Sequence, residues 1–154
     1  MPPDGPAEAG AAAHFRALES LYRHAPINRL FDAAIEVGEG FCRIRFDVHE
    51  GVYHAAGAAH GTIYFKMMDD AAFYACNSLV TDRFLLTTAF NLNFTRPLRH
   101  GPVVAEGRWE SGRRRVFVAD TRLIDAQGEV AARGTGTFMR SHIALTSLAG
   151  YKSG

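Results

Sequence analysis

The chain lacks the features that mark membrane, nucleic-acid-binding and disulfide-bonded proteins. Its 154 residues include two cysteines, and they contain no run of about 18 apolar residues that could cross a bilayer. The 17 basic and 16 acidic residues give a net charge of +1, so no strong field attracts nucleic acid or an anionic membrane. We therefore expect a cytoplasmic globular protein.

The cysteines and histidines also lack the spacing of metal-binding or redox motifs. Cys42 and Cys76 lie in apolar surroundings without a CxxC pair, which indicates two buried thiols in a reducing compartment. His49, His54 and His60 include no HxxxH or HExxH pair that would frame a zinc site. We therefore expect no metal site.

The length fits one domain that can bury a sizeable core. The first ten residues are rich in Pro, Gly and Ala, and we expect them to be disordered. Residues 144–154 are expected to form a flexible tail. This leaves a single domain over residues 11–143.

Hydrophobic spacing predicts a short helix over residues 11–22 and one long helix over residues 61–81. Alternating or apolar segments predict strands over residues 28–37, 41–49, 84–95, 103–110, 115–124 and 130–140. The long helix is apolar over most of its circumference, so the rest of the chain must enclose it. We predict an α+β protein in which an antiparallel sheet wraps around this helix, with its last four strands in meander order. This is the outline of a hotdog fold.

One acid of the long helix stands apart from its polar stripe. At roughly 100° per residue, Lys66, Asp70 and Asn77 fall within about 40° of one another, whereas Asp69 lies about 60–100° away. Asp69 is surrounded on the wheel by apolar residues, namely Phe65, Ala72, Phe73 and Cys76. A carboxylate there is costly to desolvate, so Asp69 is either a bonded core or interface acid or a catalytic group. Asp70 is explained by an i,i+4 ion pair with Lys66 on a solvated stripe.

Several segments together resemble one family. The sequence HAAGAAHGTIYFKMMD that begins at His54, followed by ACNS, NLNFTRPLRHG and GTGTF, resembles the PaaI-type branch of hotdog acyl-CoA thioesterases, whose signature reads roughly HGGxxxxLxDxAxxxA. The resemblance covers about residues 27–138. It implies hydrolysis of acyl-CoA or aryl-CoA thioesters by a homodimer or homotetramer, without a metal or cofactor.

The resemblance also implies roles for matched residues. The backbone N–H of Gly61, at the start of the helix, would polarise the thioester carbonyl, as free amides at a helix N-terminus can. Asp69 would act as general base or as nucleophile, Thr87 would orient the attacking water, and His60 would shape the loop. In related dimers this acid comes from the opposite subunit, so the site would span the interface.

Two positions depart from the family pattern. His54 stands where an Asn is common, which places a titratable group beside the site, and Thr62 replaces the common second glycine near the acyl pocket. Phe65 is either packing or part of the acyl channel. The run Arg113-Arg114-Arg115 is either a solvated hairpin end or a contact for the phosphates of CoA.

Two other functions stay open at this stage. A hotdog scaffold can bind acyl-CoA without catalysis, because fold does not fix function. It can also carry an enoyl-CoA hydratase or dehydratase, whose sites generally pair a catalytic His with an acid.

Overall fold

The computed structural model describes residues 6–154. The elements in chain order are α1 (Pro6–His24), the 3-10 helix η1 (Pro26–Leu30), β1 (Ala33–Gly38), β2 (Phe41–Val48), the 3-10 helix η2 (Glu50–Val52), α2 (Gly61–Asn77), β3 (Arg83–Phe94), β4 (Gly101–Ser111), β5 (Val116–Ile124), β6 (Val130–Ala144) and the 3-10 helix η3 (Leu145–Ser147). Within the described part of the chain, no helix is long and apolar enough to cross a membrane.

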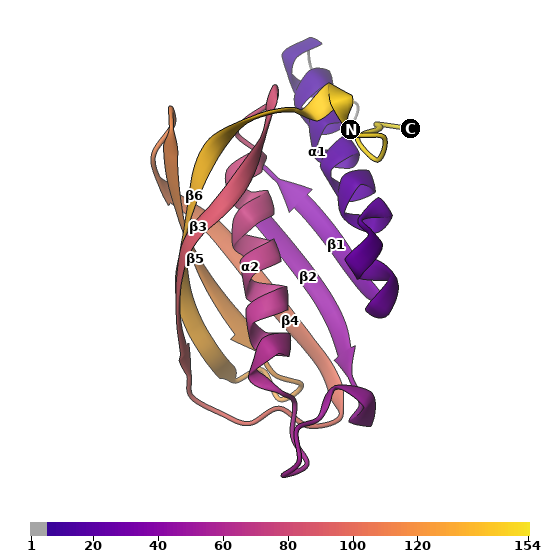
Figure 1. Ribbon diagram of the computed structural model, residues 1–154, viewed down its shortest axis with the longest axis vertical. Coiled ribbons are helices and arrows are strands. Elements are labelled where there is room, and N and C mark those ends of the chain that lie inside the picture. Colours follow the sequence, from indigo (N-terminus) through magenta and orange to yellow (C-terminus); the bar gives the residue numbers. More distant parts are fainter. Residues whose placement is uncertain (1–5) are drawn as a thin grey trace.

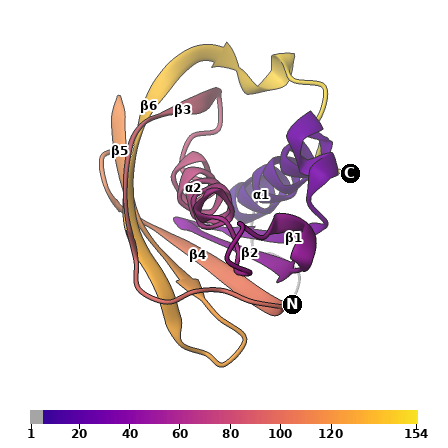
Figure 2. The same cartoon turned by 60° about the horizontal axis from the view of Figure 1, so that its bottom comes forward.

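The six strands form one antiparallel sheet in the order β1-β2-β4-β5-β6-β3. The sheet curves around α2, and α1 lies beside α2 on the side that the sheet leaves open (Figure 1, Figure 2). This arrangement confirms the predicted hotdog fold with its additional N-terminal helix. An apolar helix needs such enclosure because no single flat layer could cover its whole circumference.

The predicted meander of the last four strands is wrong in one respect. Only β4, β5 and β6 are consecutive neighbours, whereas β3 pairs with β6 at the far edge of the sheet. The side of β4 that a meander would give to β3 is occupied by β2. Local alternation shows that a segment is extended, but it does not show which strand lies beside it.

Both ends of the chain are more ordered than the sequence suggested. Helix α1 already begins at Pro6, while residues 1–5 of the expected disordered segment lie outside the described residues. At the other end β6 continues to Ala144, and Leu145 is fully buried in the core. The Tyr151 hydroxyl lies 2.6 Å from His14 Nδ1, so this part of the expected flexible tail contacts α1.

The predicted strand over residues 28–37 divides into η1 and β1. Pro26 occupies the start of η1, where its fixed φ suits a helical turn and its missing N–H costs nothing. Helix α2 ends at Asn77, four residues before the predicted end. There the Asn77 side chain donates to the Val80 and Arg83 carbonyls and accepts from the Leu85 N–H. The Asn77 side chain therefore supplies hydrogen bonds that hold the turn between α2 and β3.

Helix α2 lies very close to the centre of the sheet. Ala71 and Ala72 on α2 are fully buried, and they face Gly107 of β4. A Cβ atom at position 107 would stand 2.2 Å from the Ala71 carbonyl oxygen and 2.6 Å from the Ala72 nitrogen. Gly107 is thus required by the approach of two backbones.

A β-bulge changes which side chains of β3 face α2. Thr87 pairs with Phe138 and Ala89 with Thr137, which leaves Thr88 as an extra residue. Leu85 and Thr87 face α2 before the bulge, and Phe90 faces it afterwards, with its ring 5.3 Å from that of Phe65. Without the bulge, the two-residue alternation of a strand would put Thr87 and Phe90 on opposite faces. The bulge therefore brings both the polar and the aromatic side chains of β3 onto the helix.

We predict that Gly107→Ala lowers the free energy of unfolding by about 3 kcal/mol, because the new methyl group must push α2 away from β4. Gly38→Ala is the control, since a Cβ atom at position 38 meets no atom within 4 Å. It should change stability by less than about 0.5 kcal/mol. Chemical denaturation of both variants measures the difference, and equal stabilities would contradict the close approach.

Candidate active site

The start of α2 is built around His60, which is the N-cap residue. Its Nδ1 accepts from the Thr62 N–H at 3.1 Å and also lies 3.0 Å from the Thr62 hydroxyl, and its carbonyl accepts from the Ile63 N–H at 2.9 Å. The Gly61 N–H finds no acceptor within residues 6–154. His60 therefore fixes the loop by capping the helix, while the amide of Gly61 stays available as a donor.

Gly61 lines a cleft of about 450 Å³. The cleft is lined by His54 from the preceding loop, by Tyr64 of α2, and by residues 94–97 at the end of β3. A Cβ atom at position 61 would lie 3.3 Å from the Phe94 ring, so glycine also leaves room for this aromatic wall. The arrangement offers a backbone donor beside a partly apolar surface.

His54 is exposed and is held by its own loop. Its ring Nδ1 accepts from the Ala56 N–H at 3.0 Å, and its backbone N–H donates to the Ala58 carbonyl at 2.8 Å. The ring thus lies in the same cleft as Gly61, with Nε2 as its remaining polar atom. Thr62, the other departure from the family pattern, is exposed and bonded to His60 and is not among the residues that line this cleft.

Asp69 lies two turns further along α2, in a second cleft of about 360 Å³. Its Oδ1 accepts a hydrogen bond from the Thr87 hydroxyl at 3.0 Å. The remaining walls are mainly apolar and come from η1, α2 and β3, including Phe65 and Phe73. The structure therefore brings together three of the residues singled out in the sequence: Asp69, Thr87 and Phe65.

The surroundings of Asp69 change its acidity. Burial raises the pKa of the Asp69 carboxyl from 3.8 to about 6, and the nearby charge of Asp70 adds to this. The Thr87 hydrogen bond and the Lys66 ammonium act in the opposite direction, but they do not cancel the effect of burial. Asp69 is consequently a carboxylate at neutral pH that binds a proton much more readily than an exposed aspartate.

The Asp70–Lys66 pair exists as predicted, but it is not on a solvated stripe. The two side chains are 20% and 13% exposed, and Lys66 Nζ also donates to Asn28 Oδ1 of η1 at 2.6 Å. The ammonium lies 5.3 Å from the Tyr22 ring centroid and 5.4 Å from that of Phe31. The helical wheel gave the correct angle for this stripe, but it could not show that α1 and η1 cover it.

The two clefts lie one after the other along α2 and β3. Because β3 runs back along α2, Phe94 lies beside Gly61, Phe90 beside Phe65, and Thr87 beside Asp69. Gly61 and Asp69 are eight residues apart in the helix, a rise of roughly 12 Å. The amide donor and the carboxylate of one chain therefore cannot act on the same carbonyl group.

The three arginines of the β4–β5 turn lie away from both clefts. Arg113, Arg114 and Arg115 are exposed, and none of them lines either cleft. The Arg113 guanidinium lies 4.3 Å from the ring centroid of Trp109, whose indole N–H donates to the Gly112 carbonyl at 2.8 Å. These contacts fit the hairpin-end interpretation, while a contact with CoA phosphates stays a prediction.

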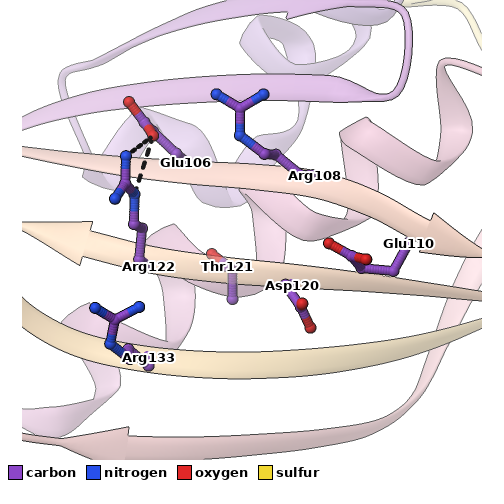
Figure 3. Close-up of a pocket in the computed structure, with 7 residues that line it drawn as sticks. All are labelled: Glu106, Arg108, Glu110, Asp120, Thr121, Arg122 and Arg133. Carbon is purple, nitrogen blue, oxygen red and sulfur yellow. Dashed lines mark hydrogen bonds and ion pairs between the residues drawn. The ribbon is translucent and has the colours of Figure 1, made fainter.

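A third hollow, of about 100 Å³, lies on the outer face of the sheet (Figure 3). Glu106 accepts there from Arg122 at 3.2 and 3.0 Å and from Arg43 at 3.3 Å. Burial opposes ionisation of Glu106, but the bonds and charges of the two arginines outweigh it and lower its pKa. All of the lining residues are polar or charged, so this hollow has no apolar wall for an acyl chain.

Over residues 6–154, no three His, Cys, Asp or Glu side chains gather to hold a metal ion.

Comparison with solved structures supports the fold. The Escherichia coli PaaI protein from the phenylacetic acid degradation operon aligns with a TM-score of 0.80 over 87% of this chain and 97% of that chain, at 20% identity. A thioesterase from Haemophilus influenzae aligns with a TM-score of 0.73 over 80% of this chain and 87% of that chain, at 17% identity. At such identities the likeness concerns the fold alone.

Sequence comparisons add the family. A protein of Saccharolobus solfataricus, described by its name as an esterase, is 29% identical over 101 residues, which cover 66% of this chain and 67% of the relative. Residues 56–132 match the model of the thioesterase superfamily, and this range includes both Gly61 and Asp69. The chain belongs to the thioesterase superfamily.

Proposed function

We propose that the protein hydrolyses acyl-CoA or aryl-CoA thioesters to the free acid and CoA. The observation that carries this proposal is the pairing of Asp69 with Thr87 in a largely apolar cleft, where burial raises the pKa of the carboxyl to about 6. A carboxylate of this kind is a better proton acceptor at neutral pH than an exposed aspartate. Membership in the thioesterase superfamily supports the same reaction class.

In the proposed reaction, the ionised Asp69 removes a proton from a water molecule that Thr87 helps to orient. The water oxygen forms a bond to the thioester carbonyl carbon, and the Gly61 N–H stabilises the negative charge on the carbonyl oxygen. The carbon–sulfur bond then breaks, and the departing thiolate takes up the proton held by Asp69. Direct attack by Asp69 followed by hydrolysis of the anhydride gives the same products. Neither route requires a metal or another cofactor.

The proposed site spans two chains. The distance between Gly61 and Asp69 within one chain favours an arrangement in which each site takes its amide from one protomer and its acid from the other. Strand β3 supports such an assembly, because it is an edge strand whose neighbourhood exposes Phe65, Leu86 and Phe94. We propose a homodimer through this edge, with homotetramers as the further assembly.

The other two candidate functions are less well supported. A hydratase or dehydratase would pair a catalytic His with the acid, and in a shared site His54 beside Gly61 is the histidine in question, but membership in the thioesterase superfamily favours hydrolysis. A binding module without catalysis would not require a carboxylate of raised pKa beside an apolar cleft.

The two buried free cysteines support a reducing, cytoplasmic location.

We predict that Asp69→Asn reduces thioester hydrolysis by at least about 100-fold, because the amide cannot accept the proton. The measurement is thiol release from a panel of acyl-CoA and aryl-CoA substrates. Asp47→Asn, on the exposed outer face of β2, is the control and should retain activity. Turnover by Asp69→Asn at the wild-type rate would remove the proposed mechanism.

The same variant should be more stable than the wild type above about pH 6. The folded state binds more protons than the unfolded state between about pH 4 and pH 6, so the raised pKa of Asp69 makes stability fall as the pH rises through this window. After allowance for partial solvent exposure, the gain of Asp69→Asn is about 1–2 kcal/mol near pH 8 and disappears below about pH 4. Denaturation at the two pH values therefore also separates lost chemistry from lost folding.

The pH dependence of hydrolysis tests the Asp69–Thr87 bond. We predict that kcat/KM rises with pH through a midpoint near the Asp69 pKa of about 6 and then becomes level. Thr87→Val should move this midpoint upward, since the lost hydrogen bond stabilised the ionised form, whereas Thr87→Ser should leave it in place. An unchanged or lower midpoint in Thr87→Val would contradict the assigned role.

A shared site predicts complementation between two inactive variants. Gly61→Pro removes the amide donor at a position where proline suits a helix, and His60 already has the extended φ of −61° and ψ of 145° that proline requires of its predecessor. Gly61→Ala keeps the N–H and is the matched control for the added contact with Phe94. Co-expressed Asp69→Asn and Gly61→Pro chains should recover about one quarter of wild-type activity through mixed dimers.

Light scattering on the wild type should give at least a dimer. No recovery in the mixed preparation, although mixed dimers form, would show that each site is contained within one chain. A stable, active monomer would have the same meaning.

A further inference from the structure

One wall of the Asp69 cleft is a short segment without a buried residue. Helix η1 and the residue before it place Ala25, Ile27 and Asn28 along the cleft, while α2 and β3 form the other walls. Ile27 is apolar yet 53% exposed. An acyl group that occupied the cleft would cover this side chain and remove it from water.

A single side-chain bond links this wall to α2 among the described residues. Lys66 Nζ donates to Asn28 Oδ1 at 2.6 Å, and Asn28 Nδ2 donates to the Tyr22 carbonyl at 2.7 Å. The Asn28 amide therefore ties η1 to both helices at once. The other hydrogen bonds of η1 are backbone bonds within its own turn.

The anchoring lysine is itself held by buried groups. Lys66 is paired with Asp70 and lies over the rings of Tyr22 and Phe31. A buried ion pair adds little net stability compared with apolar side chains of similar volume, although it fixes the positions of its members well. The cluster is therefore better explained by the position that it gives to Asn28 than by its contribution to stability.

We propose that Ile27 selects the acyl group of the substrate by closing the cleft into which Asp69 opens, and that the Asn28–Lys66 bond sets the position of this wall. The inference rests on the proposed hydrolysis of CoA thioesters. A cleft of about 360 Å³ with apolar walls fits a single aromatic ring or a medium-length alkyl chain. An acetyl group leaves most of this space empty, and a long-chain acyl group is too long to fit within it.

The first test compares acetyl-CoA with phenylacetyl-CoA and decanoyl-CoA. Ile27→Trp should lower kcat/KM for the two larger substrates by about tenfold or more, through KM, and leave that for acetyl-CoA within about twofold. Leu30→Trp is the matched control, because Leu30 lies in the same segment, is 77% exposed and does not line the cleft. An equal loss for all three substrates, or the same effect from Leu30→Trp, would overturn the assignment of Ile27.

The second test concerns the anchor. Asn28→Ala should reduce the ratio of kcat/KM for phenylacetyl-CoA over palmitoyl-CoA by about fivefold or more, since a released wall no longer excludes the long chain. Asn28→Asp keeps the acceptor for Lys66 but loses the donor to the Tyr22 carbonyl, so it should retain more of the selectivity than Asn28→Ala does. A merely structural role of Asn28 would lower both rates together, and that result would overturn the positioning role.

A binding measurement separates this inference from the proposed function. Nile red, a neutral apolar dye, should bind the wild type and Leu30→Trp with similar affinity, and Ile27→Trp with about tenfold lower affinity. If no thioester is hydrolysed but this binding pattern holds, the proposed reaction is wrong and the assignment of Ile27 to the cleft wall is kept. If Ile27→Trp binds the dye as well as the wild type does, the assignment of Ile27 is wrong, whichever reaction the protein catalyses.

Discussion

The enclosure of α2 by the curved sheet is the interaction on which the rest of the structure depends. Ala71 and Ala72 lie against Gly107 with no space for another atom, which fixes the depth of the helix in the sheet. Both clefts open where α2 meets the edge strand β3, because the sheet covers the other face of the helix. The depth of α2 thus determines how much water reaches Asp69, and with it the pKa of this carboxyl.

Asp69 and Asp70 show two ways in which one helix can hold an acid. Asp70 points toward α1 and η1, where the Lys66 ammonium balances its charge. Asp69 points toward β3, where it accepts a hydrogen bond from the uncharged hydroxyl of Thr87. Burial raises the pKa of Asp70 too, but the charge and the hydrogen bond of Lys66 oppose this effect. Asp69 forms no ion pair with a described residue, and its pKa of about 6 lets it exchange a proton near neutral pH, which is the property that acid–base chemistry needs.

Much of this site could be predicted from the sequence, because helix geometry is regular. The angular separation of Asp69 from Asp70, and the loop-to-helix boundary at Gly61, follow from residue spacing alone. The family resemblance then supplied Thr87 as a site residue that orients water, whereas its hydrogen bond to Asp69 was seen only in the structure. The bulge at Thr88 could not be predicted, since the extra residue breaks the two-residue alternation on which strand patterns rely.

Features that depend on contacts with distant segments were the hardest to predict from the sequence. The pattern of β3 indicates an extended segment, but its place beside β6 depends on the route of the whole chain. The sequence around Lys66 likewise shows a polar stripe and cannot show that residues 22–31 cover it. Asn28 and Ile27 were missed for this reason, because a short segment between a helix and a strand carries no periodic signal.

The end of α2 shows where this chain can change in length. The Asn77 carbonyl accepts from His14 Nε2 at 2.9 Å, and its side chain bonds to three backbone groups between Val80 and Leu85. One residue thus ties together α1, α2 and the start of β3, so an insertion between residues 78 and 82 would move all three. Among the described residues, the hydrogen bonds that close the β5–β6 turn run between Asp125 and its own neighbours, and the turn's ion pair to Arg96 joins two largely exposed side chains at 3.7 Å. Evolution or design can lengthen the chain at that turn without disturbing the site.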